Sequence, residues 1–271
     1  MEFKLPERKE ISHKGTYGRV LNIAGTDFMP GAAYLSSVSA LKIGCGYCFL
    51  CTTDEARLAI ASKTSNVVFV IPKNLGASIK EADVIEIGCG LGQGKYAHKV
   101  FDKFLKYANR DLPVVIDADG LNIISKNPDK FIKSGFKNVV FTPHPIEAAR
   151  LLNVDNVLNN IEGAAKFISE KYNCITVLKN HKTFVCSPDG RSYINETGNN
   201  AMAKAGSGDV LTGMISGLAA QGMDLFEASC LGVYLHGACG DLQKERLTEY
   251  SVMAEDLISA IPEVLKFYMN N

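Results

Sequence analysis

Residues 113–119, PVVIDAD, form a near-continuous apolar run that ends in two aspartates, and residues 83–88, DVIEIG, repeat the pattern and end in a glycine. Apolar runs of this kind are typical of strands covered on both faces, as in a parallel sheet flanked by helices. Strand-length runs alternate with longer amphipathic patterns along almost the whole chain. The sequence therefore predicts an α/β fold with three layers, α/β/α, and a mostly parallel central sheet.

The alternation gives a definite set of expected elements. The sequence predicts strands at residues 19–25, 46–52, 67–71, 83–88, 113–118, 138–142, 174–179, 182–187 and 191–195. It predicts helices at residues 31–43, 54–62, 95–109, 145–152, 159–172, 208–221, 225–244 and 251–268, the last with Ser251 as its N-cap. The last two strands are joined by Ser-Pro-Asp-Gly, which indicates an antiparallel hairpin at one edge. With no linker in sight, we expect one domain over residues 1–271.

Composition excludes several classes of partner. Lys+Arg and Asp+Glu both number 29, so the formal net charge is zero, which argues against nucleic acid or an anionic membrane surface. No stretch reaches the roughly 18 apolar residues of a membrane span, and the charged N-terminus lacks a secretory apolar segment. We expect a cytoplasmic protein whose eight cysteines are reduced thiols.

Cys45, Cys48 and Cys51 have the spacing C-x2-C-x2-C, which is compatible with a metal or iron–sulfur site. No fourth ligand stands nearby at a suitable spacing. The segment GYCFLCT reads as a strand, which would point Cys48 and Cys51 to opposite faces. We therefore interpret these cysteines as small buried residues.

Glycine and acidic residues gather where the predicted strands end, which is where ligands bind in open α/β sheets. Residues 88–94, GCGLGQG, contain four glycines but match neither the G-x4-G-K-[ST] nor the G-x-G-x-x-G pattern of nucleotide sites. The loop is compatible with close approach of a bulky ligand to the backbone, or simply with a tight turn.

The strongest cluster is residues 198–211, GNNAMAKAGSGDVL. Gly206, Ser207 and Gly208 are small and precede an apolar helix, so their backbone N–H groups can point into one concavity at the positive end of the helix. That is an anion hole suited to a phosphoryl group in transfer. Asp209, beside it, can act as a general base toward a substrate hydroxyl, and we expect it to be ionised at neutral pH.

The GSGDVL segment resembles the anion-hole signature of ribokinase-like small-molecule kinases. The chain as a whole resembles one branch, the nucleotide-dependent NAD(P)H-hydrate dehydratases, in its stand-alone form without an epimerase domain. The stretches that carry this resemblance run in family order: KGTYGRVLNIAG (14–25), MPGAAYLSSVSALKIGCG (29–46), IGCGLG (87–92), VIDADGL (115–121), FTPHPIEAARLL (141–152), VLKNHKT (177–183), residues 198–211 and YLHGACGD (234–241).

The resemblance implies a ribokinase-like fold and a two-step repair reaction. A nucleotide phosphorylates the C6 hydroxyl of the S epimer of NADH or NADPH hydrate, and phosphate then leaves to regenerate the reduced cofactor. ADP is the expected co-substrate, giving AMP and phosphate, with ATP as the alternative, and Mg²⁺ is the expected metal. The resemblance also implies a homotetramer or larger assembly and a separate epimerase as a working partner.

Residue by residue, the resemblance makes Asp209 the base and Gly206, Ser207 and Gly208 the anion hole. It assigns the hydrated-cofactor pocket to Ala32, Ala33, Gly90, His144 and Asp209. It assigns nucleotide binding to Lys179, Asn180, His181, Lys182, Thr183, Asn199 and Gly208. No metal ligand is assigned with certainty.

Two positions depart from the family pattern. Asn180 replaces the usual glycine of L-K-G, and we expect it to tolerate a positive φ. Cys89 replaces the proline of G-P-G-L-G, which removes a rigid residue.

Other polar residues carry weaker signals. Asp117 and Asp119 would share one face of a strand and orient Mg²⁺-bound waters, or Asp119 would cap a helix. His144 can instead be a turn-stabilising histidine. His236 is interpreted as packed rather than catalytic, and Lys204 as solvated.

Two other functions remain open at this point. A kinase of a small alcohol, of the hydroxymethylpyrimidine, hydroxyethylthiazole or pyridoxal type, would use the same GSGD segment. The stretches at 141–152 and 14–25 favour the dehydratase. A nucleotide-sensing module with a dead site would be expected to have lost Asp209, which is present.

Overall fold

The computed structural model of the protein describes residues 3–270. Within these residues nine strands form a single sheet in the order β3-β2-β1-β4-β5-β6-β7-β8-β9. The strands are β1 Arg19–Ile23, β2 Tyr47–Cys51, β3 Val68–Val70, β4 Val84–Ile87, β5 Val114–Ile116, β6 Val139–Phe141, β7 Ile175–Leu178, β8 Phe184–Cys186 and β9 Ser192–Ile194. Each lies inside a range predicted from the sequence.

The pairing of the strands confirms the predicted mixed sheet. From β3 to β7 every neighbouring pair is parallel, whereas β8 pairs antiparallel with both β7 and β9. The β8–β9 connection contains Gly190 at a φ of 92°, a conformation that glycine adopts without steric cost. The predicted edge hairpin is therefore present.

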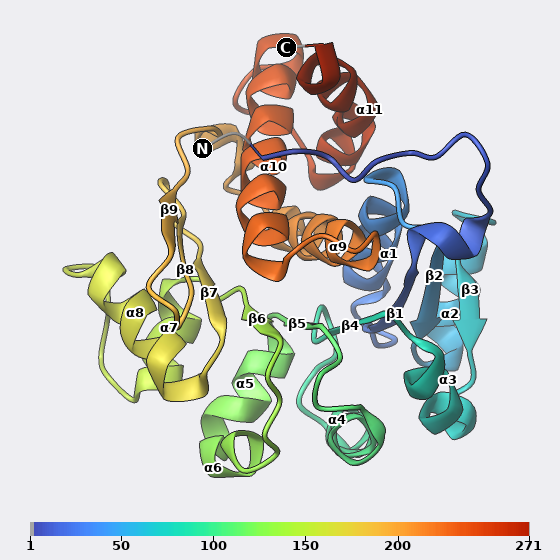
Figure 1. The fold of residues 1–271 in the computed structure, drawn as a ribbon, viewed down its shortest axis with the longest axis vertical. Coiled ribbons are helices and arrows are strands. Elements are labelled where there is room, and N and C mark those ends of the chain that lie inside the picture. The colour runs from blue at the N-terminus through green and yellow to red at the C-terminus, as the bar shows by residue number, and fades with distance from the viewer. Residues whose placement is uncertain (1–2, 271) are drawn as a thin grey trace.

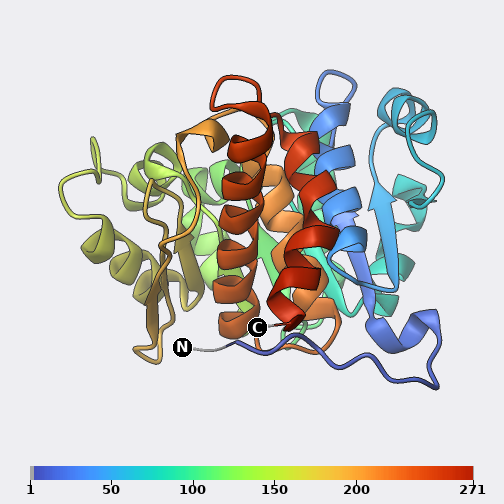
Figure 2. The ribbon, with the colours of Figure 1, turned by 90° about the horizontal axis from the view of Figure 1, so that it is seen from above.

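Helices cover both faces of the sheet, as Figures 1 and 2 show. Helices α1, α9, α10 and α11 lie on one face, and α3 to α8 lie on the other. No helix among the described residues is long and apolar enough to cross a bilayer. The helices are α1 Pro30–Lys42, α2 Asp54–Ala61, α3 Leu75–Glu81, α4 Lys95–Tyr107, α5 Asp119–Lys126, α6 Pro128–Ile132, α7 Pro145–Leu152, α8 Ile161–Tyr172, α9 Ser207–Ala220, α10 Leu225–Leu247 and α11 Ala254–Asn270, with 3-10 turns η1 Lys14–Tyr17, η2 Pro72–Asn74 and η3 Asn200–Met202.

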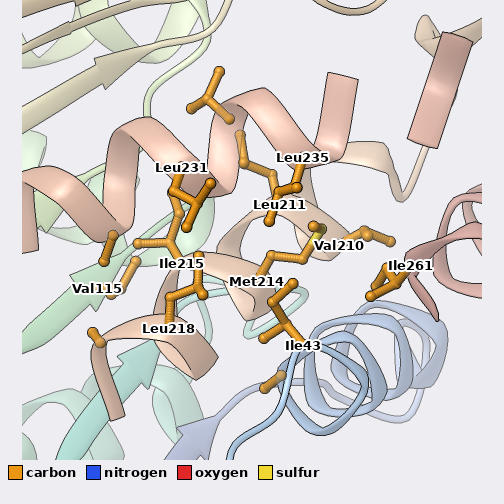
Figure 3. Close-up of a cluster of buried hydrophobic side chains, with 14 of the residues drawn as sticks. Ile43, Val115, Val210, Leu211, Met214, Ile215, Leu218, Leu231, Leu235 and Ile261 are labelled. Carbon is orange, nitrogen blue, oxygen red and sulfur yellow. The ribbon is translucent and has the colours of Figure 1, made fainter. Parts of the chain in front are cut away.

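Helix α9 lies at the centre of the larger core cluster. From Val210 to Ala220 every residue is buried, which is the pattern of a helix surrounded by protein on all sides. In Figure 3, Met214 and Leu218 of α9 lie near Ile43 at the end of α1 and Val115 of β5. The position of this helix is therefore fixed by packing along its whole length.

The cysteines of the C-x2-C-x2-C segment follow the strand interpretation. Cys45 and Cys48 belong to the core cluster under α9, whereas Cys51 belongs to the cluster on the other side of the sheet. All three carry free, buried thiols. Burial raises the pKa of the Cys51 thiol to about 11, so it is an uncharged apolar residue at neutral pH.

Some helix predictions were incomplete. Helices α3, α5 and α6, of seven, eight and five residues, were not predicted, whereas α2 and α7, of eight residues each, were. The last helix begins at Ala254 rather than at Ser251. Instead of a Ser251 cap, the Asp256 carboxylate accepts the Met253 N–H at 2.8 Å.

We predict that Gly213→Ala destabilises the fold, because a Cβ at Gly213 would lie 2.0 Å from the Ser36 carbonyl oxygen of α1. Overpacking of this kind typically costs about 1–3 kcal/mol in the free energy of unfolding. Urea denaturation of the variant measures it. Gly31→Ala on α1 is the matched control, since a Cβ there meets nothing within 4 Å. Equal stability of the two variants would contradict this account of the α1–α9 contact.

Candidate active site

The carboxyl ends of β1, β4 and β5 converge at one edge of the sheet with almost no space between their backbones. Gly25, after β1, donates its N–H to the Cys89 carbonyl oxygen at 2.8 Å. Gly88, after β4, has a φ of 129°, and a Cβ there would lie 1.9 Å from the Asp117 carbonyl oxygen. The glycines therefore allow three strand ends to meet where a ligand is expected.

The glycine-rich loop reaches the start of α1 and the start of α5. A Cβ on Gly90 would lie 2.7 Å from the Cβ of Ala32, so these two predicted substrate-pocket residues are adjacent. Ala33 is fully buried behind them against Gly25. Gly92 donates its N–H to the Asp119 carboxylate at 2.7 Å. The loop is thereby anchored at both ends.

The first turn of α9 presents backbone amides at this edge. Gly206 takes the left-handed conformation at a φ of 93° and forms the N-cap, where a Cβ would lie 2.6 Å from Leu35. Ser207 donates its N–H to the Lys204 carbonyl oxygen, and Val210 donates to that of Gly206. Among the described residues, the N–H groups of Gly208 and Asp209 have no backbone acceptor, as is typical of a helix start. Of the predicted anion hole, the Ser207 amide is thus occupied within the protein, whereas the amides of Gly208 and of Asp209, which was not predicted to contribute one, are open to an anion.

Asp117, after β5, connects three elements at this edge. Its carboxylate accepts the Lys179 ammonium at 2.7 Å and the Thr212 hydroxyl of α9 at 2.9 Å. The Asp117 side chain is 2% exposed and that of Lys179 19%. Burial by itself lowers the pKa of Lys179, but the carboxylates of Asp117 and Glu147 raise it above its ordinary value, so the lysine is charged.

Asp209 is half-buried beside this pair. Burial, together with the negative charge of Asp117, raises the pKa of its carboxyl to about 6, while Cys89 and Lys179 oppose the shift. At pH 7 the group is therefore still mostly ionised, as expected from the sequence. Burial, rather than the helix dipole, sets the direction of the shift. A carboxylate with this pKa is suited to accept a proton near neutral pH.

Cys89, Asp117 and Asp209 place one ligand atom each within 4.8 Å of one another. These residues do not fit a protein-only cage for Mg²⁺, which prefers six oxygen ligands. Burial raises the pKa of the Cys89 thiol well above its usual range, and the Asp117 carboxylate is neutralised by Lys179. A hard cation would therefore need oxygens brought by a ligand.

His144 occupies the N-cap of α7. Its Nδ1 accepts the N–H groups of Ile146 and Glu147, and the Glu147 carboxylate accepts the His144 N–H at 2.9 Å. This capping box supports the alternative of a turn-stabilising histidine. Burial and the charge of Lys179 lower the pKa of His144, so the ring is neutral, and 43% of its side chain is exposed.

The residues assigned to the nucleotide separate into two groups. Lys179 points inward, and a Cβ on Gly208 would lie 3.3 Å from its Nζ. Asn180, His181 and Lys182 are exposed on the β7–β8 connection, with Thr183 partly buried at its end. The structure therefore brings Lys179 to Asp209 and leaves the next three residues at the rim.

Asn199 is held by structural contacts. Its Oδ1 accepts the Ala201 N–H, and its Nδ2 donates to the Asp241 carboxylate of α10 at 2.8 Å. Gly198 donates its N–H to the same carboxylate at 2.9 Å. These bonds fix the segment that leads into Gly206.

The departures from the family pattern are accommodated. Asn180 is not among the described residues with positive φ, so the turn requires no glycine and the expected left-handed conformation is not adopted. Cys89 is fully buried, and its carbonyl oxygen accepts the Gly25 N–H.

Lys204, interpreted as solvated, is exposed but donates to the Tyr250 carbonyl oxygen.

Asp117 and Asp119 do not share a strand face as proposed. Ala118 lies between them at a φ of 47°, which is strained for a residue with a Cβ, and Asp119 begins α5. The Asp119 carboxylate accepts the Gly92 N–H of the glycine-rich loop instead of capping its helix. Such strain is typical of functional sites, and no local sequence signal indicates it.

Two further residues lie at this edge without having been assigned to the site from the sequence. Thr212 lies three residues after Asp209 on α9, so the two side chains are neighbours on the helix surface. This spacing is the sequence signal that could have indicated Thr212. His236 was interpreted as packed, and it is buried, but its Nε2 lies 3.3 Å from the Ser207 hydroxyl at the start of α9. Burial lowers the pKa of His236 to about 4, so this contact is made by a neutral ring.

Comparison with known proteins gives the same family over most of the chain. The NAD(P)H-hydrate dehydratase family model matches residues 20–263. The ADP-dependent (S)-NAD(P)H-hydrate dehydratase of Neisseria meningitidis is 40% identical over 88% of this chain and 81% of its own length. The corresponding Bacillus subtilis protein is 35% identical over 97% of this chain and 94% of its own length.

Solved structures agree with the sequence comparison. The ADP/ATP-dependent NAD(P)H-hydrate dehydratase of Bacillus subtilis, co-crystallised with ATP and Mg²⁺, has a TM-score of 0.83 and 32% identity, covering 97% of this chain and 94% of that one. A ribokinase from Thermotoga maritima, at a TM-score of 0.55 and 14% identity, covering 93% of this chain and 99% of that one, shares the fold alone. The chain therefore belongs to the NAD(P)H-hydrate dehydratase family and has a ribokinase-like fold.

Proposed function

We propose that this protein is an ADP-dependent (S)-NAD(P)H-hydrate dehydratase, a lyase that restores NADH and NADPH from their hydrates. The observation that carries the proposal is the half-buried Asp209 carboxylate beside the open amides of the first turn of α9. Named relatives at 35–40% identity support the substrate class.

The first step is phosphoryl transfer to the C6 hydroxyl of the hydrate. The amides of Gly208 and Asp209 receive the phosphoryl oxygens, and the Asp209 carboxylate accepts the hydroxyl proton as the new O–P bond forms. The bond between the transferred phosphorus and the bridging oxygen of the nucleotide breaks. Lys179 and the helix start stabilise the negative charge that develops.

The second step removes the new phosphate ester. The C6–O bond breaks with its electron pair leaving on phosphate, C5 gives its proton to water, and the C–H electrons form the C5–C6 double bond of the dihydronicotinamide ring. Hydroxide is a poor leaving group and phosphate a good one. A site with the architecture of a kinase is therefore suited to a net dehydration.

For the nucleotide, ADP is the proposed co-substrate, giving AMP and phosphate, with ATP as the alternative. The B. subtilis neighbour co-crystallised with ATP and Mg²⁺ supports this class. Mg²⁺ would be held chiefly by nucleotide phosphate oxygens, because it usually keeps several waters and binds through substrate phosphates. We propose that the rim residues Asn180 to Thr183 and Asn199 contribute to the nucleotide site.

A plain kinase of a small alcohol is less well supported. The GSGD segment and Asp209 would serve it equally. The hydroxyethylthiazole kinase of Pyrococcus horikoshii is a structural neighbour at only 15% identity and a TM-score of 0.67, over 93% of this chain, which supports the fold alone.

We further propose a cytoplasmic homotetramer or larger assembly that works with a separate epimerase. The bifunctional repair enzyme Nnr of Escherichia coli supports the epimerase partner, since this chain matches 50% of its length at 35% identity.

The activity is tested by mixing the protein with NADH hydrate, ADP and Mg²⁺ and following NADH absorbance. We expect recovery of NADH with stoichiometric AMP and phosphate. The control omits nucleotide. Absence of recovery with both ADP and ATP would overturn the proposal.

Asp209→Asn is expected to lower turnover by about 10²–10⁴-fold, the usual contribution of a general base, with nucleotide binding retained. In the wild type, the rate should fall as the pH is lowered through about 6, since protonation of Asp209 removes the base. Initial-rate assays from about pH 5 to 8 measure this fall in rate. A wild-type rate in the variant would exclude the role.

Lys179→Met is expected to leave Asp117 buried and unpaired, lowering the free energy of unfolding by about 3–5 kcal/mol. Loss of the positive charge also raises the pKa of Asp209. The fall of the rate at low pH should therefore begin at a higher pH than in the wild type. Denaturation and the pH profile measure the two effects. Lys80→Met, at an exposed lysine of α3, is the control. If the two variants had the same free energy of unfolding and the same pH profile, the role of the ion pair would be contradicted.

A further inference from the structure

Glu86 is a glutamate in the middle of the central strand β4 and is fully buried. It shares a sheet face with Val84, which packs in the core cluster beneath α9. On the neighbouring strand β1, Asn22 is its register partner and is also fully buried. An acid and an amide therefore lie side by side under α1 and α9.

The Asn22 Nδ2 donates to the hydroxyls of Ser36 and Ser37, but the acceptor oxygens of this pair are left over. Among the described residues, both carboxyl oxygens of Glu86 and the Oδ1 of Asn22 are buried without a partner. The hydroxyls of Ser36 and Ser216 lie close enough to Glu86 to lower its pKa, but Ser216 donates to the Thr212 carbonyl oxygen at 2.8 Å and Ser36 contacts that of Ala33 at 3.5 Å. Three buried acceptor oxygens without a donor are costly, and an ionised carboxylate there is costlier still.

One proton removes most of this cost. A protonated Glu86 is itself a donor, and its neighbours offer acceptors. We propose that Glu86 is held as a neutral carboxylic acid that donates to the Asn22 amide oxygen, and that loss of this proton sets the alkaline limit of nucleotide binding at the active site. The second half of this inference rests on the proposed function.

The link to the active site is a run of polar groups along α9. Thr212 bonds Asp117, and Ser216 lies one turn further along the helix, beside Glu86. Burial raises the pKa of Glu86 to about 8; the hydroxyls of Ser36 and Ser216 oppose this shift, and the charges of Asp209 and Asp117 add to it. Titratable groups that interact with Glu86 from the surrounding elements are Asp209 of α9, Asp117 after β5, Cys45 and Cys48 at β2, and Cys89 after β4.

Ionisation of Glu86 would add a negative charge that interacts with Asp209 and Asp117 at the site where phosphate is received. The expected effect is a weaker affinity for ADP above about pH 8, on the order of tenfold for one buried charge. Glu86→Gln keeps the shape and the donor of the neutral acid but cannot ionise. Its affinity for ADP should therefore stay level where that of the wild type falls.

Stability gives a readout that needs neither substrate nor turnover. The pKa of Glu86 is raised on folding from 4.5 to about 8, so the folded state holds a proton that the unfolded state has lost. The free energy of unfolding of the wild type should fall, relative to Glu86→Gln, as the pH rises from 4.5 to about 8. Glu81→Gln, at an exposed glutamate of α3, is the matched control and should follow the wild type.

The experiment combines urea denaturation, calorimetric ADP binding and infrared difference spectra of the three proteins from about pH 5 to 9. Beside the absorption of Glu147, whose pKa burial raises to about 7, the wild type should show a carboxylic acid C=O band at pH 7 that Glu86→Gln lacks and that disappears above about pH 8. Absence of that band from the wild type would overturn the neutral acid, even if the variant did not fold. If the ADP affinities of the wild type and of Glu86→Gln changed with pH in the same way, the proposed alkaline limit would be wrong. Failure of dehydratase activity alone would leave these readouts intact and count only against the proposed function.

Discussion

The hydrogen bond from Thr212 to Asp117 joins the helix that carries the proposed base to the strand end that carries its electrostatic partner. The same carboxylate receives the ammonium of Lys179 from the end of β7. A buried carboxylate is stable only when it is paired and hydrogen-bonded, so these contacts have to form together. They hold α9, β5 and β7 in one arrangement, and the first turn of α9 takes its place at the sheet edge as a consequence.

The packing of α9 makes that arrangement possible. Gly213 allows α1 to approach α9 closely, and a Cβ on Gly217 would lie 2.4 Å from Ile43. With Gly206 in a left-handed conformation, the chain enters the helix without a side chain at the point of closest contact. Small residues on this helix therefore serve two purposes, since they permit close packing along its length and leave backbone amides accessible at its start.

Polar groups beneath the site extend the same principle into the core. Glu86, Asn22 and the hydroxyls of α1 and α9 lie where an α/β protein would ordinarily place apolar side chains. Their burial is tolerable only if protons are distributed so that each acceptor finds a donor. The protonation of the core and the charge of the active site are therefore coupled through a few neighbouring side chains.

The sequence by itself determined the order of the strands and of most helices, the edge hairpin, the start of α9 and the family, because these depend on local periodicity, on glycine and on motif order. Only the tertiary structure decided that Lys179 pairs with Asp117 rather than extending toward the rim, that His144 caps α7, and that Asp119 accepts a glycine-loop amide. It also decided that Glu86 and Asn22 are neighbours whose acceptor oxygens have no donor among the described residues. These features depend on contacts between residues far apart in the chain, and on burial, which changes the charge state of a carboxyl without leaving any mark in the local sequence.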